Sequence, residues 1–308
     1  MTIRSIDKSQ LPLDRPLYAE DAPDPALRYL RYPARDGFVL GALLYTPETP
    51  TDRVFILVPG LSGGILGGPH DYRPLARRVV DGGAAVFLLN MRSANTFAQA
   101  RFPDSASDIA GAVDWLKAHG YSRIALFGTS LGGPRVAYYN EIHGDPAVEM
   151  IGFLASIRSP YLAVSDGPGA AHMAELDAVL SEARALVAAG KPQAGLTFDH
   201  LLPGRPQTMG AASFLSYFGT PDDTPCNTIH HGAAITVPTL VVHGTKDEIS
   251  NISNGRDIYD SLTAAPSREL LYVEGADHYL TAGWICRAYA EIVASWTEAR
   301  FAGLPVAG

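Results

Sequence analysis

The sequence predicts an α/β fold, in which a mostly parallel central sheet is flanked by helices. The chain has 308 residues, of which 47% are hydrophobic, and this is enough to bury a large core. Segments with strand-like and helix-like patterns alternate along most of the chain, as they do in sheets that carry helices on both faces. The expected strand at 53–59 contains a continuous apolar run, Val54–Val58, which is typical of a strand buried on both faces.

The expected elements follow one another in a regular order. Residues 1–26 are polar and rich in proline, and we expect them to form an N-terminal arm before a single domain at 27–308. The domain opens with a hairpin that turns at Asp36-Gly37. The expected strands cover 27–34, 38–46, 53–59, 84–91, 123–127, 148–156, 239–242 and 269–273, and the expected helices include 72–80, 105–119, 174–189, 254–263 and 281–300.

Local signals mark one helix boundary and one long insertion. Ser105 and Asp108 have the spacing of a capping box at the start of the helix at 105–119. Farther along, residues 160–235 interrupt the alternation, and they contain an amphipathic helix at 174–189. An insertion of this length in a compact sheet protein is usually a lid or a binding element, so we expect a lid at about 160–235.

Composition and charge exclude several classes of function. The net charge is −8 at pH 7, and an acidic chain is poorly suited to bind nucleic acid through its phosphates. The N-terminus has no apolar signal segment and no apolar run is long enough to span a bilayer, so we expect a cytoplasmic protein without a membrane partner. Cys226 and Cys286 lie far apart without metal-ligand spacing, so we expect no metal. The glycine-rich loop after residue 59 has neither the G-x-G-x-x-G nor the G-K-[ST] pattern of a nucleotide site, and we expect no cofactor.

A candidate nucleophile lies where the strand at 123–127 runs directly into a turn and a helix. The turn reads Gly128-Thr129-Ser130-Leu131-Gly132, which is the G-x-S-x-G pattern in the strand–turn–helix context that the pattern requires. A strand that turns at once into a helix leaves the corner residue strained, with its side chain protruding near the positive end of the helix. The alternative is a glycine-rich turn in which Ser130 only caps the helix.

With this turn and its flanking elements, the chain resembles the α/β-hydrolase family over roughly residues 27–300. The resemblance implies an α/β-hydrolase fold and a catalytic triad in the chain order serine, acid, histidine. His278 follows the strand at 269–273, in the loop that holds the catalytic histidine in the family. Asp247 occupies the acid position in the loop His243-Gly244-Thr245-Lys246-Asp247, and Glu248 is the rival acid. His243 is expected to pack against the strand end.

The resemblance also suggests donors for an oxyanion hole. One donor is the backbone N–H of Leu131, the residue after the nucleophile. The other comes from the loop after 53–59, where Leu61 is the candidate and Ser62 is the near rival. Pro59 stands where the family commonly has a histidine, so part of the usual hydrogen bonding is expected to differ here.

Four residues are candidates for contact with substrate, and each has an alternative role. They are Ser62, Arg92, Phe198 and Tyr217. Arg92 follows a strand end and either faces substrate or forms a surface salt bridge. Phe198 and Tyr217 either line an apolar pocket or pack the lid onto the core.

The expected function is that of a serine hydrolase. Its substrate would be an ester, thioester or lactone of a small to medium organic molecule, cleaved through an acyl-enzyme. The same triad could instead hydrolyse a C–C or amide bond or transfer an acyl group, because fold and triad do not fix the substrate. A third possibility is a protein that binds a ligand on this fold without turnover.

Overall fold

The computed structural model describes residues 1–11, 26–61, 64, 72–96, 98–166, 168–201, 206–279 and 284–303. Its main strands are β1 (Thr2–Ile6), β2 (Ala26–Pro33), β3 (Val39–Thr46), β4 (Arg53–Val58), β5 (Ala85–Leu89), β6 (Arg123–Thr129), β7 (Val148–Leu154), β10 (Thr239–Gly244) and β11 (Arg268–Val273). The helices around them are α1 (Arg73–Asp81), α2 (Ser93–Thr96), α3 (Asp104–Ala118), α4 (Gly132–His143), α9 (Ser253–Ser261) and α10 (Trp284–Phe301).

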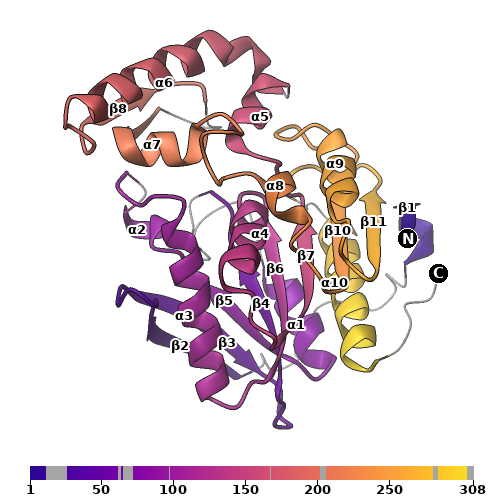
Figure 1. Ribbon diagram of the computed structural model, residues 1–308. Helices are drawn as coiled ribbons and strands as arrows, with labels where there is room; N and C mark the ends of the chain where they lie inside the picture. Colours follow the sequence, from indigo (N-terminus) through magenta and orange to yellow (C-terminus); the bar gives the residue numbers. More distant parts are fainter. Residues whose placement is uncertain are drawn as a thin grey trace.

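These strands form a 9-stranded sheet in the order β1-β11-β10-β7-β6-β4-β5-β3-β2 (Figure 1). Each pair of neighbours in this order is parallel as far as β4 and β5. The last two pairs, β5 with β3 and β3 with β2, are antiparallel. The prediction of a mostly parallel sheet is therefore confirmed. The chain leaves β4 toward β5 on one side and returns to β6 on the other, so the carboxyl ends of β4 and β6 flank a topological switch point, where open α/β sheets bind ligands.

Helices cover both faces of this sheet because side chains alternate along each strand. In β4, Phe55 and Leu57 belong to the core on one face, which α1 and α10 cover. Val54 and Ile56 belong to the core on the other face, which α3, α4 and α9 cover. Figure 1 shows α3 and α4 in front of the sheet. All four side chains are fully buried, as the continuous apolar run in the sequence predicted.

The N-terminal segment corrects one expectation. Residues 2–6 do not lie in an arm outside the sheet; they form β1, which pairs in parallel with β11 from Thr2 opposite Glu269 to Ile6 opposite Val273. The physical reason is that β11 would otherwise present a row of unpaired backbone groups at the sheet edge. The apolar Ile6 also packs into the core, and Asp7 then caps a single 3-10 turn at Lys8–Gln10.

The start of α3 also differs from the prediction. The helix begins at Asp104 after Pro103, and Ser105 donates its hydroxyl to the Phe102 carbonyl rather than capping the helix. Asp108 does not reach back toward Ser105, because it is fully buried and binds Arg92. The spacing of a capping box was therefore misleading here, since an ion pair in the core uses the carboxylate instead.

The segment between β7 and β10 forms a separate group of elements, which we call the insertion (residues 160–235). It comprises α5 (Pro160–Ser165), a 3-10 helix (Pro168–His172), α6 (Met173–Ala188), β8 (Gly195–Phe198), β9 (Gln207–Gly210), α7 (Ala211–Phe218) and α8 (Thr228–Gly232). In Figure 1, α6, α7 and β8 lie together at one end of the molecule. They share an apolar cluster that includes Leu176, Phe198 and Phe214 together with Leu131, the residue that follows Ser130.

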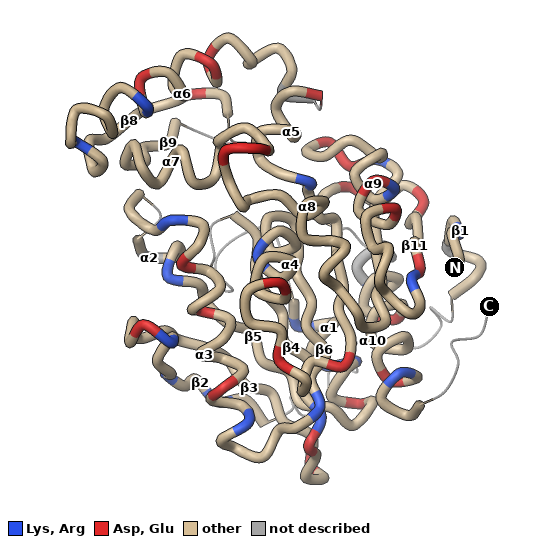
Figure 2. Tube along the Cα trace, in the orientation of Figure 1, with Lys and Arg blue, Asp and Glu red and all other residues tan. Residues whose placement is uncertain are grey.

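Charged side chains are distributed over many elements. Figure 2 shows Lys and Arg interspersed with Asp and Glu along the described chain in this view. Many of them form ion pairs, such as Arg35 with Asp114 and Arg123 with Glu149. No helix in the described part of the chain is both long enough and apolar enough to cross a membrane.

Candidate active site

Ser130 lies at the corner between β6 and α4 in a strained backbone conformation. Its φ is 53°, in the left-handed region that residues with a side chain rarely adopt. Such a conformation costs about 1–3 kcal/mol and persists only where neighbouring structure fixes it. Here the Ser130 N–H donates to the Leu154 carbonyl at 2.9 Å, and the Gly133 N–H donates to the Ser130 carbonyl at 3.1 Å. The corner therefore holds the hydroxyl clear of both elements.

Two glycines of the motif allow this sharp turn. A Cβ atom on Gly128 would lie 2.3 Å from the Gly132 carbonyl oxygen. A Cβ atom on Gly132 would lie 2.2 Å from the Val58 carbonyl oxygen. Because real Cβ atoms do not approach backbone oxygens so closely, glycine is required where β4, β6 and α4 meet.

His278 lies in the loop after β11, and its ring connects Ser130 with Asp247. The Nε2 atom is 2.9 Å from Ser130 Oγ, and the Nδ1 atom is 2.8 Å from Asp247 Oδ2. A carboxylate facing Nδ1 selects the tautomer that carries its proton there, which leaves Nε2 free to accept from the serine hydroxyl. The structure thus brings together the three residues that the sequence singled out as nucleophile, base and acid.

The Asp247 side chain is completely buried and fully hydrogen-bonded. Oδ1 accepts the N–H groups of Ile249 and Ser250, and Oδ2 accepts the Ser250 hydroxyl as well as the His278 ring. Burial raises the pKa of Asp247, but the hydrogen bonds and charge of His278 and the Ser250 N–H outweigh burial, so this pKa lies below its usual value. The rival acid, Glu248, faces away from the imidazole nitrogens in its described contacts: it accepts the backbone N–H of His278, at 3.2 Å.

His243 lies behind the acid, which the sequence did not reveal. It packs at the end of β10, as expected, but its Nε2 atom is also 3.7 Å from Asp247 Oδ2. The ring is completely buried, and burial lowers the pKa of His243, so the ring is neutral near pH 7. The spacing of four residues between His243 and Asp247 was the signal that could have suggested this contact.

The loop after β4 passes directly beside the nucleophile. A Cβ atom on Gly60 would lie 3.2 Å from Ser130 Cβ and 3.6 Å from Ser130 Oγ. Among the described residues, no backbone hydrogen bond uses the N–H of Leu61 or Leu131, the two groups expected to form the oxyanion hole. Ser62, the rival donor and a candidate for substrate contact, lies outside the described residues.

Arg92 binds side chains of the protein itself. Its guanidinium pairs with Asp108 at 2.6 Å and with Asp36 at 2.7 Å, and it lies 4.8 Å from the centre of the Phe38 ring. The Asp108 carboxylate is fully buried, and the Arg92 side chain is 11% exposed. These contacts favour the salt-bridge alternative over contact with substrate.

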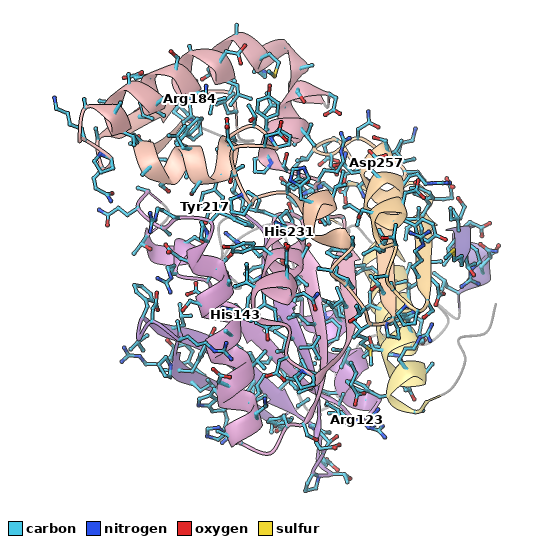
Figure 3. The ribbon with its side chains drawn as sticks, in the orientation of Figure 1. Arg123, His143, Arg184, Tyr217, His231 and Asp257 are labelled. Carbon is cyan, nitrogen blue, oxygen red and sulfur yellow. The ribbon has the colours of Figure 1, made fainter. Side chains whose placement is uncertain are left out.

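Phe198 and Tyr217 belong to the apolar cluster of the insertion. Phe198 packs against Phe214 and Phe218, with ring centres 5.2 and 5.8 Å away. Tyr217, on α7, meets the edge of Phe102 at 5.8 Å. Figure 3 shows Tyr217 between α7 and the main body of the protein. Both side chains are almost fully buried, so these contacts favour the packing alternative for each of them.

One group of side chains in the described chain has the composition of a metal site. His172, Glu175 and His200, all on the insertion, place one ligand atom each within 4.8 Å of one another. The Glu175 carboxylate is already used, because Oε1 accepts the N–H groups of Asp199 and His200 while Oε2 faces His200 Nδ1 at 3.2 Å. These bonds explain the group as a contact between α6 and the loop after β8.

Comparisons with known proteins find similarity in structure and not in sequence. No family of known sequences matches the chain, and no curated protein matches it either. The esterase domain of a Rhodothermus marinus protein superposes with a TM-score of 0.59 at 17% identity, covering 89% of this chain and 98% of its own. The α/β hydrolase GrgF from Penicillium sp. sh18 has a TM-score of 0.67 at 14% identity and covers 89% and 98%.

A third similar structure belongs to a peptidase. The acylaminoacyl peptidase of Pyrococcus horikoshii has a TM-score of 0.62 at 12% identity, and the match covers 91% of this chain but 42% of the peptidase. Identities this low establish the fold alone. The sheet order, the turn at Ser130 and these solved structures together show that the protein has the α/β-hydrolase fold.

Proposed function

We propose that the protein is a serine hydrolase that cleaves an ester, thioester or lactone of a small to medium organic molecule. The observation that carries the proposal is the chain of contacts from Ser130 Oγ to His278 at 2.9 Å and from His278 to Asp247 at 2.8 Å. A serine hydroxyl is a poor nucleophile until an adjacent base removes its proton, and these contacts supply such a base with an acid behind it. Similar structures include esterases, which agrees with this chemistry.

In the proposed reaction, Ser130 Oγ attacks the acyl carbon while His278 Nε2 takes the hydroxyl proton. Asp247 stabilises the imidazolium that forms. The carbonyl oxygen becomes an oxyanion, which the backbone N–H groups of Leu61 and Leu131 stabilise. The imidazolium then passes its proton to the leaving alkoxide or thiolate, and an acyl-enzyme remains. Water, activated by His278, hydrolyses the acyl-enzyme and regenerates the serine.

The insertion is proposed to act as a lid that binds the acyl part of the substrate. Leu131, next to the nucleophile, belongs to the same apolar cluster as Val164 and Phe198 of the insertion, and Leu61 packs against that cluster. An acyl group bound at Ser130 would therefore meet apolar side chains on the insertion side. We expect a preference for apolar acyl groups over charged ones.

Amide or peptide bond cleavage is the second candidate, because one similar structure is an acylaminoacyl peptidase. The same serine, histidine and aspartate would serve, with His278 protonating the leaving amine. C–C bond hydrolysis, acyl transfer to an alcohol and ligand binding without turnover remain the other possibilities for this fold.

A fluorophosphonate probe with a matched variant tests the proposal. The wild-type protein should be labelled and should hydrolyse p-nitrophenyl esters, whereas Ser130→Ala should show neither labelling nor hydrolysis. A panel of p-nitrophenyl acetate, butyrate and octanoate, compared with the corresponding anilides, then separates esterase from amidase activity. Equal labelling of the wild type and Ser130→Ala would reject Ser130 as the nucleophile. Tight binding of a panel compound without turnover would favour a binding protein.

A further inference from the structure

Arg135 is a completely buried cation within α4, five residues after Ser130. No carboxylate among the described residues lies within ion-pair distance of it. A buried guanidinium without partners is strongly unfavourable, so its hydrogen bonds show what holds it in place.

Three of its partners are successive carbonyl groups of the loop beside the nucleophile. Nη1 donates to the Pro59 carbonyl at 2.9 Å and to the Gly60 carbonyl at 2.6 Å. Nη2 donates to the Leu61 carbonyl at 3.4 Å and to the Ser93 hydroxyl at 3.0 Å. The three carbonyl groups of this loop therefore all point toward the guanidinium.

Peptide geometry turns this contact into a constraint on the oxyanion hole. The Gly60 carbonyl and the Leu61 N–H belong to one planar peptide unit, in which the two groups point in opposite directions. Holding the Gly60 oxygen against Arg135 therefore directs the Leu61 N–H away from Arg135. Gly60 itself lies against Ser130, since a Cβ atom on it would be 3.2 Å from Ser130 Cβ.

We propose that Arg135 is a positioning residue that fixes the Gly60–Leu61 peptide so that its N–H faces the developing oxyanion. This inference rests on the proposed function. A glycine rotates easily, and a rotated peptide would place a carbonyl oxygen where the oxyanion must form. The charge of Arg135 also polarises the Gly60 carbonyl, which makes the Leu61 N–H of the same unit a stronger donor.

Arg135 also connects this loop with the insertion. Burial raises the pKa of Tyr217, while the charge of Arg135 and a hydrogen bond with it oppose that rise. Tyr217 belongs to α7, and Ser93 begins α2. The Arg135 guanidinium thus binds the loop at residues 59–61, Ser93 of α2 and Tyr217 of the insertion. The position of the loop therefore depends on both α2 and the insertion.

The test compares Arg135→Met, which removes the charge and its hydrogen bonds, with Arg135→Lys, which keeps a cation. Arg78→Met is the matched control, because Arg78 is a partly buried arginine that pairs with Glu291 on the opposite face of the sheet. Each variant is measured for kcat and KM on a p-nitrophenyl ester, normalised by active-site titration. Inhibition by a trifluoromethyl ketone, which forms an oxyanion adduct with serine, is measured in parallel.

For Arg135→Met we expect kcat per active site to fall about 10²–10³-fold, the usual effect of losing one oxyanion donor. KM should change little, ketone affinity should fall in parallel with kcat, and Arg135→Lys should recover part of both. Arg78→Met should keep the kcat per active site of the wild type. A purely structural role predicts fewer active sites, each with unchanged kcat, and this result would overturn the inference.

A second measurement needs no variant. In a crystal structure of the wild-type ketone adduct, the oxyanion should lie within hydrogen-bond distance of the Leu61 nitrogen, with the Gly60 oxygen still on Arg135. A Leu61 N–H directed elsewhere would contradict the inference. If the wild type shows neither labelling nor hydrolysis, the proposed function fails; if Ser130→Ala alone is inactive and Arg135→Met is normal, only this inference fails.

Discussion

The Nδ1 atom of His278 lies 2.8 Å from Asp247 Oδ2, and the two side chains are 2% and 0% exposed. Because both side chains are buried, the carboxylate fixes the Nδ1 side of the ring and favours the tautomer that carries its proton there. In the proposed reaction, the reactivity of Ser130 therefore depends on a residue that lies on the far side of the imidazole. This dependence leads to the first prediction.

Asp247→Asn should lower kcat on esters by about 10³–10⁴-fold, since an amide favours the wrong tautomer of the ring. Glu248→Gln is the matched control, because Glu248 binds the backbone N–H of His278 and not its ring. We expect its loss of kcat to stay below about tenfold, as for one ordinary hydrogen bond. Steady-state kinetics of the two variants show which carboxylate is the acid. A larger loss of kcat in Glu248→Gln than in Asp247→Asn would identify Glu248 instead.

The depressed pKa of Asp247 predicts acid sensitivity. Burial raises this pKa, but the contacts with His278 and the Ser250 N–H lower it by a larger amount, so the net shift is downward. The folded protein therefore stabilises the ionised carboxylate relative to the unfolded chain. The resulting stability is present above the unfolded pKa of about 3.9 and is lost as pH falls through the folded value. Urea unfolding between pH 3 and 7 should show a steeper acid loss for the wild type than for Asp247→Asn. Parallel curves would contradict this.

His243 predicts a second loss of stability, nearer to neutral pH. Burial lowers its pKa, so below about pH 6.5 the unfolded chain binds a proton that the native ring does not. Stability contributed by this residue is therefore present above that pH and declines below it. The difference in unfolding free energy between the wild type and His243→Leu, measured from pH 5 to 8, should narrow on acidification. A difference that is constant with pH would show that folding does not lower the pKa of His243.

Arg92→Met separates the two roles considered for Arg92. Removing it leaves Asp108 buried and without its ion-pair partner, which costs about 3–5 kcal/mol of folding stability. KM should stay near that of the wild type, because the guanidinium is bound by Asp36 and Asp108. Thermal unfolding and ester kinetics together check this, and a large rise in KM without loss of stability would restore the substrate role.

Much of the fold could be predicted because its signals are local. The apolar run in β4 and the abrupt passage from β6 into α4 reflect burial and sterics within a few residues, and both appear in the structure. The resemblance to the α/β-hydrolase family pointed to the partners of Ser130. Their places after β10 and β11 agree with it, since parallel strands deliver their carboxyl ends to one edge.

Other features could not be predicted because they depend on distant parts of the chain. The strand Thr2–Ile6 is short, and only its pairing with β11 makes it regular. Arg135 reads as an ordinary surface cation on a helix, and only the return of residues 59–61 over α4 explains its burial. The ion pair of Arg92 could not be predicted either, because the spacing along the helix suggested a capping role for its partner, Asp108.

The pairing of β1 with β11 has a consequence for synthesis. Residues 2–6 are synthesised before residues 268–273, and most of the described chain separates the two paired strands. The first strand must therefore wait, unpaired, while the rest of the sheet assembles, and the edge closes last. Until then, the growing polypeptide carries an unpaired β-segment, which a chaperone or a second nascent chain can capture.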